Sequence, residues 1–286
     1  MRYESPDSLE AASKLLATAS GDARILAGGT DLLVQMRAEV LSPELVIDIK
    51  RIAETRSIKE EAGGFRVGSA VTGAELKEHA KLRQAWPGIV EAANLIGSTQ
   101  VQGRCTMGGN LCNGSPAADS VPALIAASAL ATVVGPQGRR DIKVEDVMLA
   151  PRKLALTKGE IIASFLLPAR PAHSGDAYLR FIPRTEMDIA VVGCGISLTV
   201  DGAGTCTAAR VSLGAVAARP LLVDAAAKAL IGSKIDAAAL AKLEAAARAA
   251  CSPIDDKRGT KEFRIDIAGV LAKRTALIAL ERARKN

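Results

Sequence analysis

Two short stretches, Leu26-Ala27-Gly28-Gly29-Thr30-Asp31-Leu32 and Thr106-Met107-Gly108-Gly109-Asn110-Leu111, share one arrangement of residues. In each, a pair of glycines precedes a hydroxyl or amide side chain. Glycine has no Cβ, so the backbone can turn sharply and a ligand can approach bare N–H groups. Where such a loop opens a helix, free amides and the positive end of the helix dipole favour an anion. Two such loops in one chain predict a site for the two phosphates of a dinucleotide.

Neither glycine loop has the spacing of the G-x-G-x-x-G or G-x-x-x-x-G-K-[ST] motifs. The sequence therefore indicates neither a Rossmann site nor a P-loop. A single Gly-Gly pair is more often only a turn, so the prediction depends on the two loops together.

The composition is that of a globular protein of several units. The chain has 286 residues, of which 49% are apolar, enough to build two or three packed cores. It has no run of about 18 apolar residues, and its polar N-terminus lacks a signal-peptide core. We therefore expect a cytoplasmic protein without a membrane span. The net charge is +6, but aromatic residues make up only 2% and stud no basic stripe, so we expect no nucleic-acid partner.

Side chains that carry chemistry on their own are sparse. The five cysteines are scattered and never spaced C-x-x-C, which argues against a disulfide framework and a zinc site. The two histidines, His79 and His173, have no second ligand nearby, so we expect no metal. No nucleophile elbow or Ser-His pair indicates a catalytic residue. If the chain handles electrons, a bound redox cofactor supplies the chemistry.

The order of the expected elements, with Pro168, Pro171 and Gly175 at the second boundary, divides the chain into three units, at residues 1–55, 56–176 and 177–286. In the first, a helix starts near Ser8 and short strands are expected at 24–27 and 45–49. In the second, hairpins are expected near Gly63 and Gly135, with helices between them and a last strand at 160–168. The third unit begins with strands, expected at 177–183, 189–200 and 206–216. Helices follow there, expected at 222–230, 237–250 and 267–284.

A few charged residues could act beside the glycine loops. Asp119 follows the second loop closely, where its carboxylate could accept hydrogen bonds from ribose-like hydroxyls or cap the helix that begins there. Arg180 and Arg184, in or just after the first strand of the third unit, could stabilise negative charge on a reduced ring. Alternatively, both arginines are ordinary surface residues.

With these residues in view, the stretches 27–31 and 106–119, the latter reading TMGGNLCNGSPAAD, resemble the two signature loops of the FAD-binding subunits of molybdenum hydroxylases. Within this xanthine dehydrogenase family, the chain most resembles the medium subunits of aerobic carbon monoxide dehydrogenases. The resemblance extends over essentially the whole chain and includes residues 184–190. It implies an α+β fold in which two α/β subdomains of the PCMH type clasp FAD, followed by a three-stranded sheet with a helical bundle.

The resemblance also implies which residues contact FAD. The backbones of 27–31 and 106–110 would meet the diphosphate, Asp119 would reach ribityl or ribose hydroxyls, and Arg180 would lie near the polar edge of the flavin. Ile96 and Ile162 would pack on the cofactor, with Ile189 over the isoalloxazine ring. The full implied set is Ala27, Gly28, Gly29, Thr30, Asp31, Leu32, Ile96, Thr106, Gly108, Gly109, Asn110, Ser115, Asp119, Ile162, Arg180 and Ile189.

The implied function is electron transfer within a heterotrimer. In such assemblies a large molybdopterin subunit hydroxylates the substrate, a small subunit carries two [2Fe-2S] clusters, and the flavin passes electrons to an external acceptor. A dimer of heterotrimers is the expected assembly. Two other interpretations remain open: a self-sufficient FAD oxidoreductase of the same fold, and a binding module whose glycine loops are only turns. Ile189 and Met187 depart from residues typical of some relatives, so neither substrate nor acceptor is implied.

Overall fold

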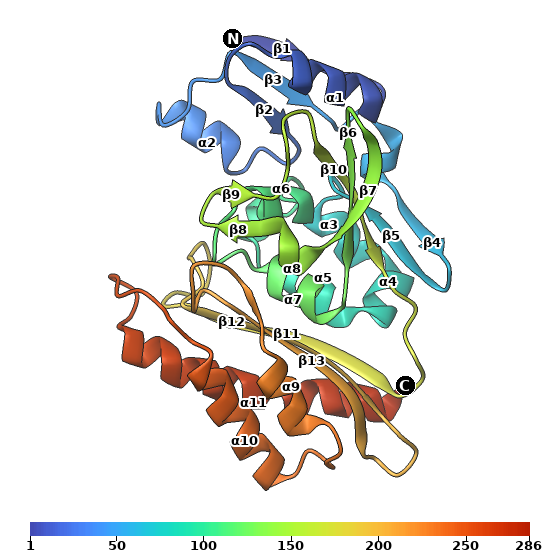
Figure 1. Cartoon of the computed structure of the whole chain (residues 1–286), viewed down its shortest axis with the longest axis vertical. Helices are drawn as coiled ribbons and strands as arrows, with labels where there is room; N and C mark the ends of the chain where they lie inside the picture. The colour runs from blue at the N-terminus through green and yellow to red at the C-terminus, as the bar shows by residue number, and fades with distance from the viewer.

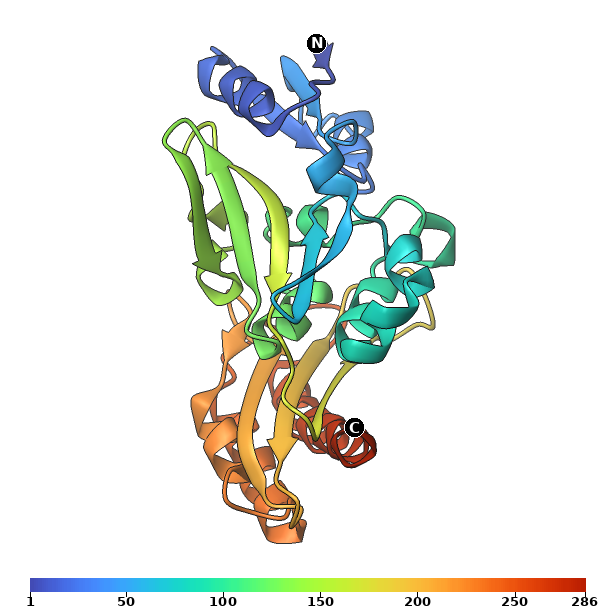
Figure 2. The same ribbon diagram turned by 90° about the vertical axis from the view of Figure 1, so that its right-hand side faces the viewer.

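Three larger β-sheets organise the chain, which the computed structural model describes over residues 1–286. They follow one another along the long axis of the molecule, from the N-terminal unit to the C-terminal unit (Figures 1 and 2). None of the helices has the length and apolar character needed to cross a membrane.

The first sheet is parallel, with the strand order β1-β3-β2. Its two expected strands are present and pair with each other. The expected helix start at Ser8 is also confirmed, because the Ser8 hydroxyl accepts a hydrogen bond from the amide of Ala11. An additional strand, β1, was not expected. The elements are β1 (Arg2–Glu4), α1 (Leu9–Thr18), β2 (Ala23–Leu26), α2 (Leu32–Arg37), β3 (Leu45–Asp48) and η1 (Ala53–Arg56).

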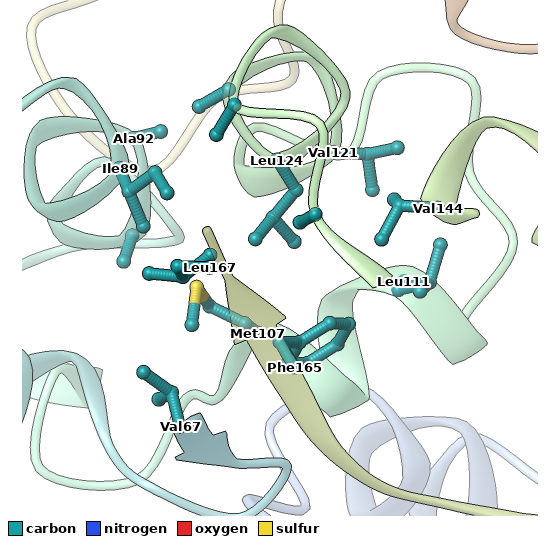
Figure 3. Close-up of a cluster of buried hydrophobic side chains, with 14 of the residues drawn as sticks. Val67, Ile89, Ala92, Met107, Leu111, Val121, Leu124, Val144, Phe165 and Leu167 are labelled. Carbon is teal, nitrogen blue, oxygen red and sulfur yellow. The ribbon is translucent and has the colours of Figure 1, made fainter. Parts of the chain in front are cut away.

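The second sheet is antiparallel, with the order β4-β5-β10-β6-β7, and it contains both expected hairpins. On one face its buried side chains form a cluster with those of the helices, including Met107, Leu111 and Phe165 (Figure 3), whereas Val134, Ile161 and Ala163 pack with the first unit. The strands are β4 (Ile58–Glu61), β5 (Gly64–Gly68), β6 (Leu130–Gly135), β7 (Gly138–Lys143) and β10 (Ile161–Leu167), with a small hairpin of β8 (Met148–Ala150) and β9 (Lys153–Leu154). The helices are α3 (Gly73–Glu78), α4 (Ala80–Ala85), α5 (Pro87–Asn94), η2 (Thr99–Val101), α6 (Met107–Cys112), α7 (Ser120–Ala126) and α8 (Val144–Val147).

The third sheet packs between helices of its own unit and helices α5 and α7 of the middle unit. A Cβ at Gly195 would stand 2.6 Å from the carbonyl oxygen of Pro122, so only glycine lets α7 lie so close to the sheet. Cys194, Ile196 and Leu198 alternate with the residues on that face and belong to the core beneath the C-terminal helices. The strands are β11 (Ser174–Phe181), β12 (Val192–Val200), β13 (Cys206–Gly214) and β14 (Leu221–Leu222), and the helices are α9 (Asp224–Leu230), α10 (Ala237–Ala249) and α11 (Lys261–Lys285).

The third sheet has four strands instead of the expected three, because Leu221 and Leu222 pair with β13 as β14. Three elements of the third unit also start three or more residues away from the expected position. The first strand starts at Ser174 instead of 177, because Ser174 already pairs with Thr199 of β12. The second starts at Val192, since residues 182–190 form a loop in which Met187 has a φ of +51°. The last helix starts at Lys261, where the Thr260 hydroxyl accepts a hydrogen bond from the amide of Phe263. The first and last of these starts are set by a pairing contact and a capping contact, which apolar periodicity does not reveal.

Candidate functional site

A cleft between the first and middle units brings the two glycine loops together. Both walls contribute polar backbone from the loops and apolar side chains from strands and short segments around them. The predicted residues that line it are Ala27, Gly28, Gly29, Thr30, Asp31, Leu32, Ile96, Thr106, Gly108, Gly109, Asn110 and Ile162. Most of the sequence-based site, distant along the chain, is thus assembled in one place.

The first glycine loop leaves its backbone donors free. It follows β2 at the carboxyl end of the parallel sheet, and Gly29 turns the chain with a φ of +77°, a conformation that favours glycine. Within the chain, no acceptor takes the amide hydrogens of residues 27–31. Successive free amides around a left-handed residue form a concavity that suits an anion. This loop therefore has the donor set that a diphosphate requires.

The second glycine loop is built differently, because its glycines form the first turn of α6. The Thr106 hydroxyl accepts a hydrogen bond from the Gly109 amide at 2.9 Å, and the Thr106 carbonyl accepts one from Asn110. The Gly108 amide donates to the carbonyl of Ser69. The expectation that both loops offer bare amides in the same way is therefore wrong for the second loop, whose donors at 108–110 already have partners.

The glycines also differ in what surrounds them. A Cβ at Gly28 would lie 2.1 Å from the carbonyl oxygen of Arg104, and one at Gly108 would lie 2.4 Å from that of Ser69. These two glycines therefore permit close backbone packing. At Gly109 the nearest atom to such a Cβ is the Thr106 hydroxyl at 3.0 Å, and the residue faces the cleft. The protein leaves this space empty, which fits the close approach of a ligand.

Polar side chains bridge the two walls. Asn113 at the end of α6 donates to a carboxylate oxygen of Asp31 at 3.2 Å and accepts from the Gln35 amide at 3.3 Å. Glu160 also lines the cleft, and its two hydrogen bonds from Arg140 help to lower its pKa to about 2. This pairing leaves little of its negative charge uncompensated beside an anionic ligand.

The rest of the lining is apolar. Ile96 and Ile162 contribute to it together with Leu154 and Leu156. A lining of aliphatic side chains with a few convergent polar groups is typical of cofactor sites and suits an extended ligand with flat rings. The residues present therefore fit a dinucleotide, with polar backbone for the diphosphate and apolar surface for the rings.

Four predicted residues, Ser115, Asp119, Arg180 and Ile189, lie outside this lining. Asp119 and Arg180 form a buried ion pair at 2.8 Å, with side chains 9% and 5% exposed, and Tyr178 donates a second hydrogen bond to Asp119. Burial raises the pKa of Asp119 to about 6. The arrangement joins α7 to β11, so Asp119 holds the middle unit to the third sheet.

The expectation that Asp119 caps the next helix is wrong, because its side chain accepts no hydrogen bond from the first turn of α7. That role belongs to Asn110, whose side-chain oxygen accepts from the amide and the hydroxyl of Ser120. Asn110 thereby connects the second glycine loop to α7. The carboxylate of Asp119 is engaged by Tyr178 and Arg180 instead.

The other two residues lie in connecting segments. Ile189 is 51% exposed and closes the 182–190 loop, in which Asp188 pairs with Arg184 and Arg258. The Arg184 side chain is 67% exposed, as expected for a surface residue. The Ser115 hydroxyl accepts a hydrogen bond from the amide of Ala117 and so shapes its own turn.

The cleft is also lined by residues that the sequence does not predict, among them Gln35, Cys105, Cys112, Asn113 and Glu160. Asn113 lies inside the quoted 106–119 stretch, and the amide side chain so close to the glycines was a usable signal. Gln35 and Glu160 become neighbours of the loops only through tertiary packing, so no local pattern marks them.

Comparison with known families gives two matches that follow one another along the chain. Residues 1–170 match the FAD binding domain in molybdopterin dehydrogenase, and residues 177–279 match the CO dehydrogenase flavoprotein C-terminal domain. Together they account for nearly all of the architecture described above.

Individual relatives agree with these matches. The carbon monoxide dehydrogenase medium chain of Afipia carboxidovorans is 33% identical over 99% of this chain and 96% of its own length. The xanthine dehydrogenase FAD-binding subunit of Escherichia coli O157:H7 is 30% identical, over 95% of this chain and 93% of its own.

Solved structures show the same fold. CO dehydrogenase from Oligotropha carboxidovorans superposes with a TM-score of 0.94 at 32% identity, covering 99% of this chain and 98% of that chain. Quinoline 2-oxidoreductase from Pseudomonas putida has a TM-score of 0.90 at 27% identity with the same coverage. The predicted fold class and cofactor, FAD, are thereby confirmed. The chain belongs to the family of FAD-binding medium subunits of the molybdenum hydroxylases, a family of oxidoreductase subunits.

Proposed function

We propose that this chain carries electrons from the [2Fe-2S] clusters of a small partner subunit, through FAD, to an external acceptor, while a large molybdopterin subunit hydroxylates the substrate. The observation that carries the proposal is the run of unpartnered amides at 27–31, facing a cleft with apolar walls. The flavin supplies the redox chemistry when bound, and the chain supplies its position and its electrostatic environment.

Within the cleft, the loop at 27–31 holds the diphosphate with its free amides, and Leu32 closes its edge. The segment 106–110 forms the opposite wall, where the space at Gly109 admits the phosphates. Ile96 and Ile162, which line the cleft, would pack on the rings. In this proposal, the first loop donates hydrogen bonds to the diphosphate, and the second loop forms a wall with space for it.

The residues outside the cleft lining have supporting roles in the same proposal. The Nε atom of Arg180 is buried without a hydrogen-bond partner, so it is a donor that the polar edge of the flavin can use. Asp119 fixes that arginine by its ion pair and offers further lone pairs to ribityl or ribose hydroxyls. Ile189, which lies outside the lining, would cover the isoalloxazine ring, and Ser115 shapes the turn that leads to Asp119.

The proposed assembly is a dimer of heterotrimers in the cytoplasm. The names of the relatives support the presence of partner subunits, since these proteins are called a medium chain and an FAD-binding subunit. All five cysteines are free thiols, as is usual for proteins of a reducing compartment.

Purification of the tagged chain from its native host tests the assembly. We expect two further polypeptides, bound iron and molybdenum, and FAD that is released on denaturation. A chain that purifies alone and oxidises an organic substrate with FAD as its only cofactor would establish the self-sufficient oxidoreductase instead. Absence of flavin from the preparation after expression with ample FAD would support a plain binding module.

Anaerobic mixing tests the electron route directly. The isolated small subunit, reduced beforehand, is added to the FAD-loaded chain, and the visible absorption band of the oxidised flavin is followed. The proposal predicts that this band disappears as the clusters reoxidise. A flavin that stays oxidised while it remains bound would contradict the route.

A further inference from the structure

A chain of polar contacts lies behind the first glycine loop and connects it to the parallel sheet. The Tyr3 hydroxyl donates to one carboxylate oxygen of Asp48 at 2.7 Å. The other oxygen accepts from the backbone amide of Lys50 at 2.9 Å and from its ammonium group at 2.8 Å. The same ammonium donates to the carbonyl oxygen of Ala27 at 3.1 Å. The loop backbone is therefore held by a side chain from a neighbouring strand end.

The strand order explains why these groups meet. In the parallel sheet, β3 lies between β1 and β2, so the carboxyl ends of β2 and β3 are adjacent. The first glycine loop leaves from β2, and Asp48 ends β3 two residues before Lys50. The Asp48 and Lys50 side chains are only 10% and 29% exposed, so water competes weakly for their contacts.

The contact with Ala27 determines where the next amide points. The chain contains no cis peptide bond, so the carbonyl oxygen of Ala27 and the amide hydrogen of Gly28 lie in one rigid plane and point in opposite directions. When Lys50 holds the oxygen on one side, the hydrogen is directed to the other. Gly28 lines the cleft and its amide has no acceptor in the chain.

We propose that Lys50 is a positioning residue for the diphosphate of FAD, which it serves by fixing the Ala27–Gly28 peptide plane without touching the cofactor. Asp48 orients the ammonium group, and Tyr3 orients Asp48. This inference rests on the proposed function, because it needs the diphosphate to lie at the first glycine loop.

A purely structural role would be different: Lys50 would then only neutralise Asp48. Ligands separate the two roles, because ADP carries the diphosphate without the flavin and riboflavin carries the flavin without phosphate. If Lys50 positions the loop, its loss lowers the affinities for FAD and ADP together and leaves the affinity for riboflavin unchanged. If the loss of Lys50 instead loosens the whole fold, the affinities for all three ligands fall and the midpoint of thermal unfolding is lowered.

The experiment measures the dissociation constants of FAD, ADP and riboflavin for the flavin-free full chain and its variants. Lys50→Met should raise the dissociation constants of FAD and ADP by about tenfold, the equivalent of one lost charge-assisted contact. Lys50→Arg, which keeps a cationic donor, should recover most of the affinity. Tyr3→Phe should weaken both ligands by about twofold to threefold, because it loosens the network only at its outer end. Lys59→Met, which removes an exposed lysine on β4, is the matched control and should change nothing.

Equal FAD and ADP affinities in wild type and Lys50→Met would overturn the inference, as would a loss of riboflavin affinity as large as that of ADP. If Lys50→Met does not fold, the Tyr3→Phe and Lys50→Arg results decide on the same criteria. The proposed function fails separately, if the wild-type chain binds neither FAD nor ADP.

Discussion

The first glycine loop leaves its amides at 27–31 without partners, whereas the second uses those at 108–110 within the protein. The difference lies two residues before each glycine pair. Thr106 occupies that place in the second loop and caps a helix, while the first loop has Leu26, whose side chain has no acceptor. One side chain thus decides whether a Gly-Gly pair becomes an open anion-binding turn or the closed first turn of a helix.

The two loops also differ in what anchors them. Met107 and Leu111 of α6 are fully buried in the middle core, beside Phe165 (Figure 3). By contrast, no residue of α2, which follows the first loop, is buried. The second loop is therefore a rigid wall, and the first depends on polar contacts from Lys50 and Asn113 for its shape.

Replacement of Asp119 should have the largest effect on stability, because the hydrogen bonds of this residue connect the part of the chain that follows the second loop to the third sheet. Asp119→Ala leaves the buried guanidinium of Arg180 without its counter-ion, which should lower the free energy of unfolding by about 3–5 kcal/mol. Chemical denaturation measures this loss. The double variant with Arg180→Met should lose less than the sum of the single changes. A loss below about 1 kcal/mol, the scale of an exposed pair, would show that the wall does not need this anchor.

Gly28→Ala acts where the two loops meet. Its Cβ would stand 2.1 Å from the Arg104 carbonyl, so the loops must separate, at a cost of about 1–3 kcal/mol and with loss of FAD retention. Gly21→Ala is the matched control, since its Cβ meets only the movable carboxylate of Glu44. Thermal unfolding and flavin content are measured on both variants. Normal flavin content in Gly28→Ala would break the claim that the loops form one site.

Alanine at the second glycine of each loop should change the stability of the protein by different amounts in the two loops. Gly29→Ala forces a non-glycine residue to a φ of +77°, which should cost about 1–2 kcal/mol. Gly109→Ala gains helix propensity of up to about 1 kcal/mol, offset by the 3.0 Å contact with the Thr106 hydroxyl, so its stability should change little. Both variants should bind FAD more weakly in titrations of the flavin-free chain. Equal stability losses at the two positions would remove the distinction.

The smallest effect should come from the hydroxyl residues. Thr106→Val removes the cap on the Gly109 amide and should lower the free energy of unfolding by about 1 kcal/mol. Thr30→Val is the counterpart in the first loop, where the hydroxyl caps no helix, and should leave stability unchanged within about 0.5 kcal/mol. Urea denaturation of the two variants gives the comparison. A larger loss for Thr30→Val would reverse the assignment of the capped loop.

Local patterns are sufficient to predict much of the fold. Ser8 marks the start of α1, the turn near Gly135 marks a hairpin, and alternating apolar residues at 194, 196 and 198 mark a strand. Strand β1 cannot be found in this way, because Arg2, Tyr3 and Glu4 are polar and become a strand only by pairing with β3. Such pairing is a property of the folded chain rather than of the segment.

The cleft is predictable in its loops and not in its contacts. The residue types at 27–31 and 106–110 predict a diphosphate site, and both stretches line the cleft. The ion pair of Asp119 with Arg180 joins residues 61 positions apart, and the contact of Lys50 with Ala27 depends on which strands are neighbours. A residue at the carboxyl end of a parallel strand, next to a glycine loop, is a signal that could have pointed to Lys50.

Amide hydrogen exchange of the flavin-free and FAD-loaded chain compares the two glycine loops in one experiment. We expect fast exchange at residues 27–31 without FAD and strong protection there with FAD, while the amides at 108–110 are protected in both states. Unchanged exchange at 27–31 on FAD binding, or protection gained only at 108–110, would contradict this expectation.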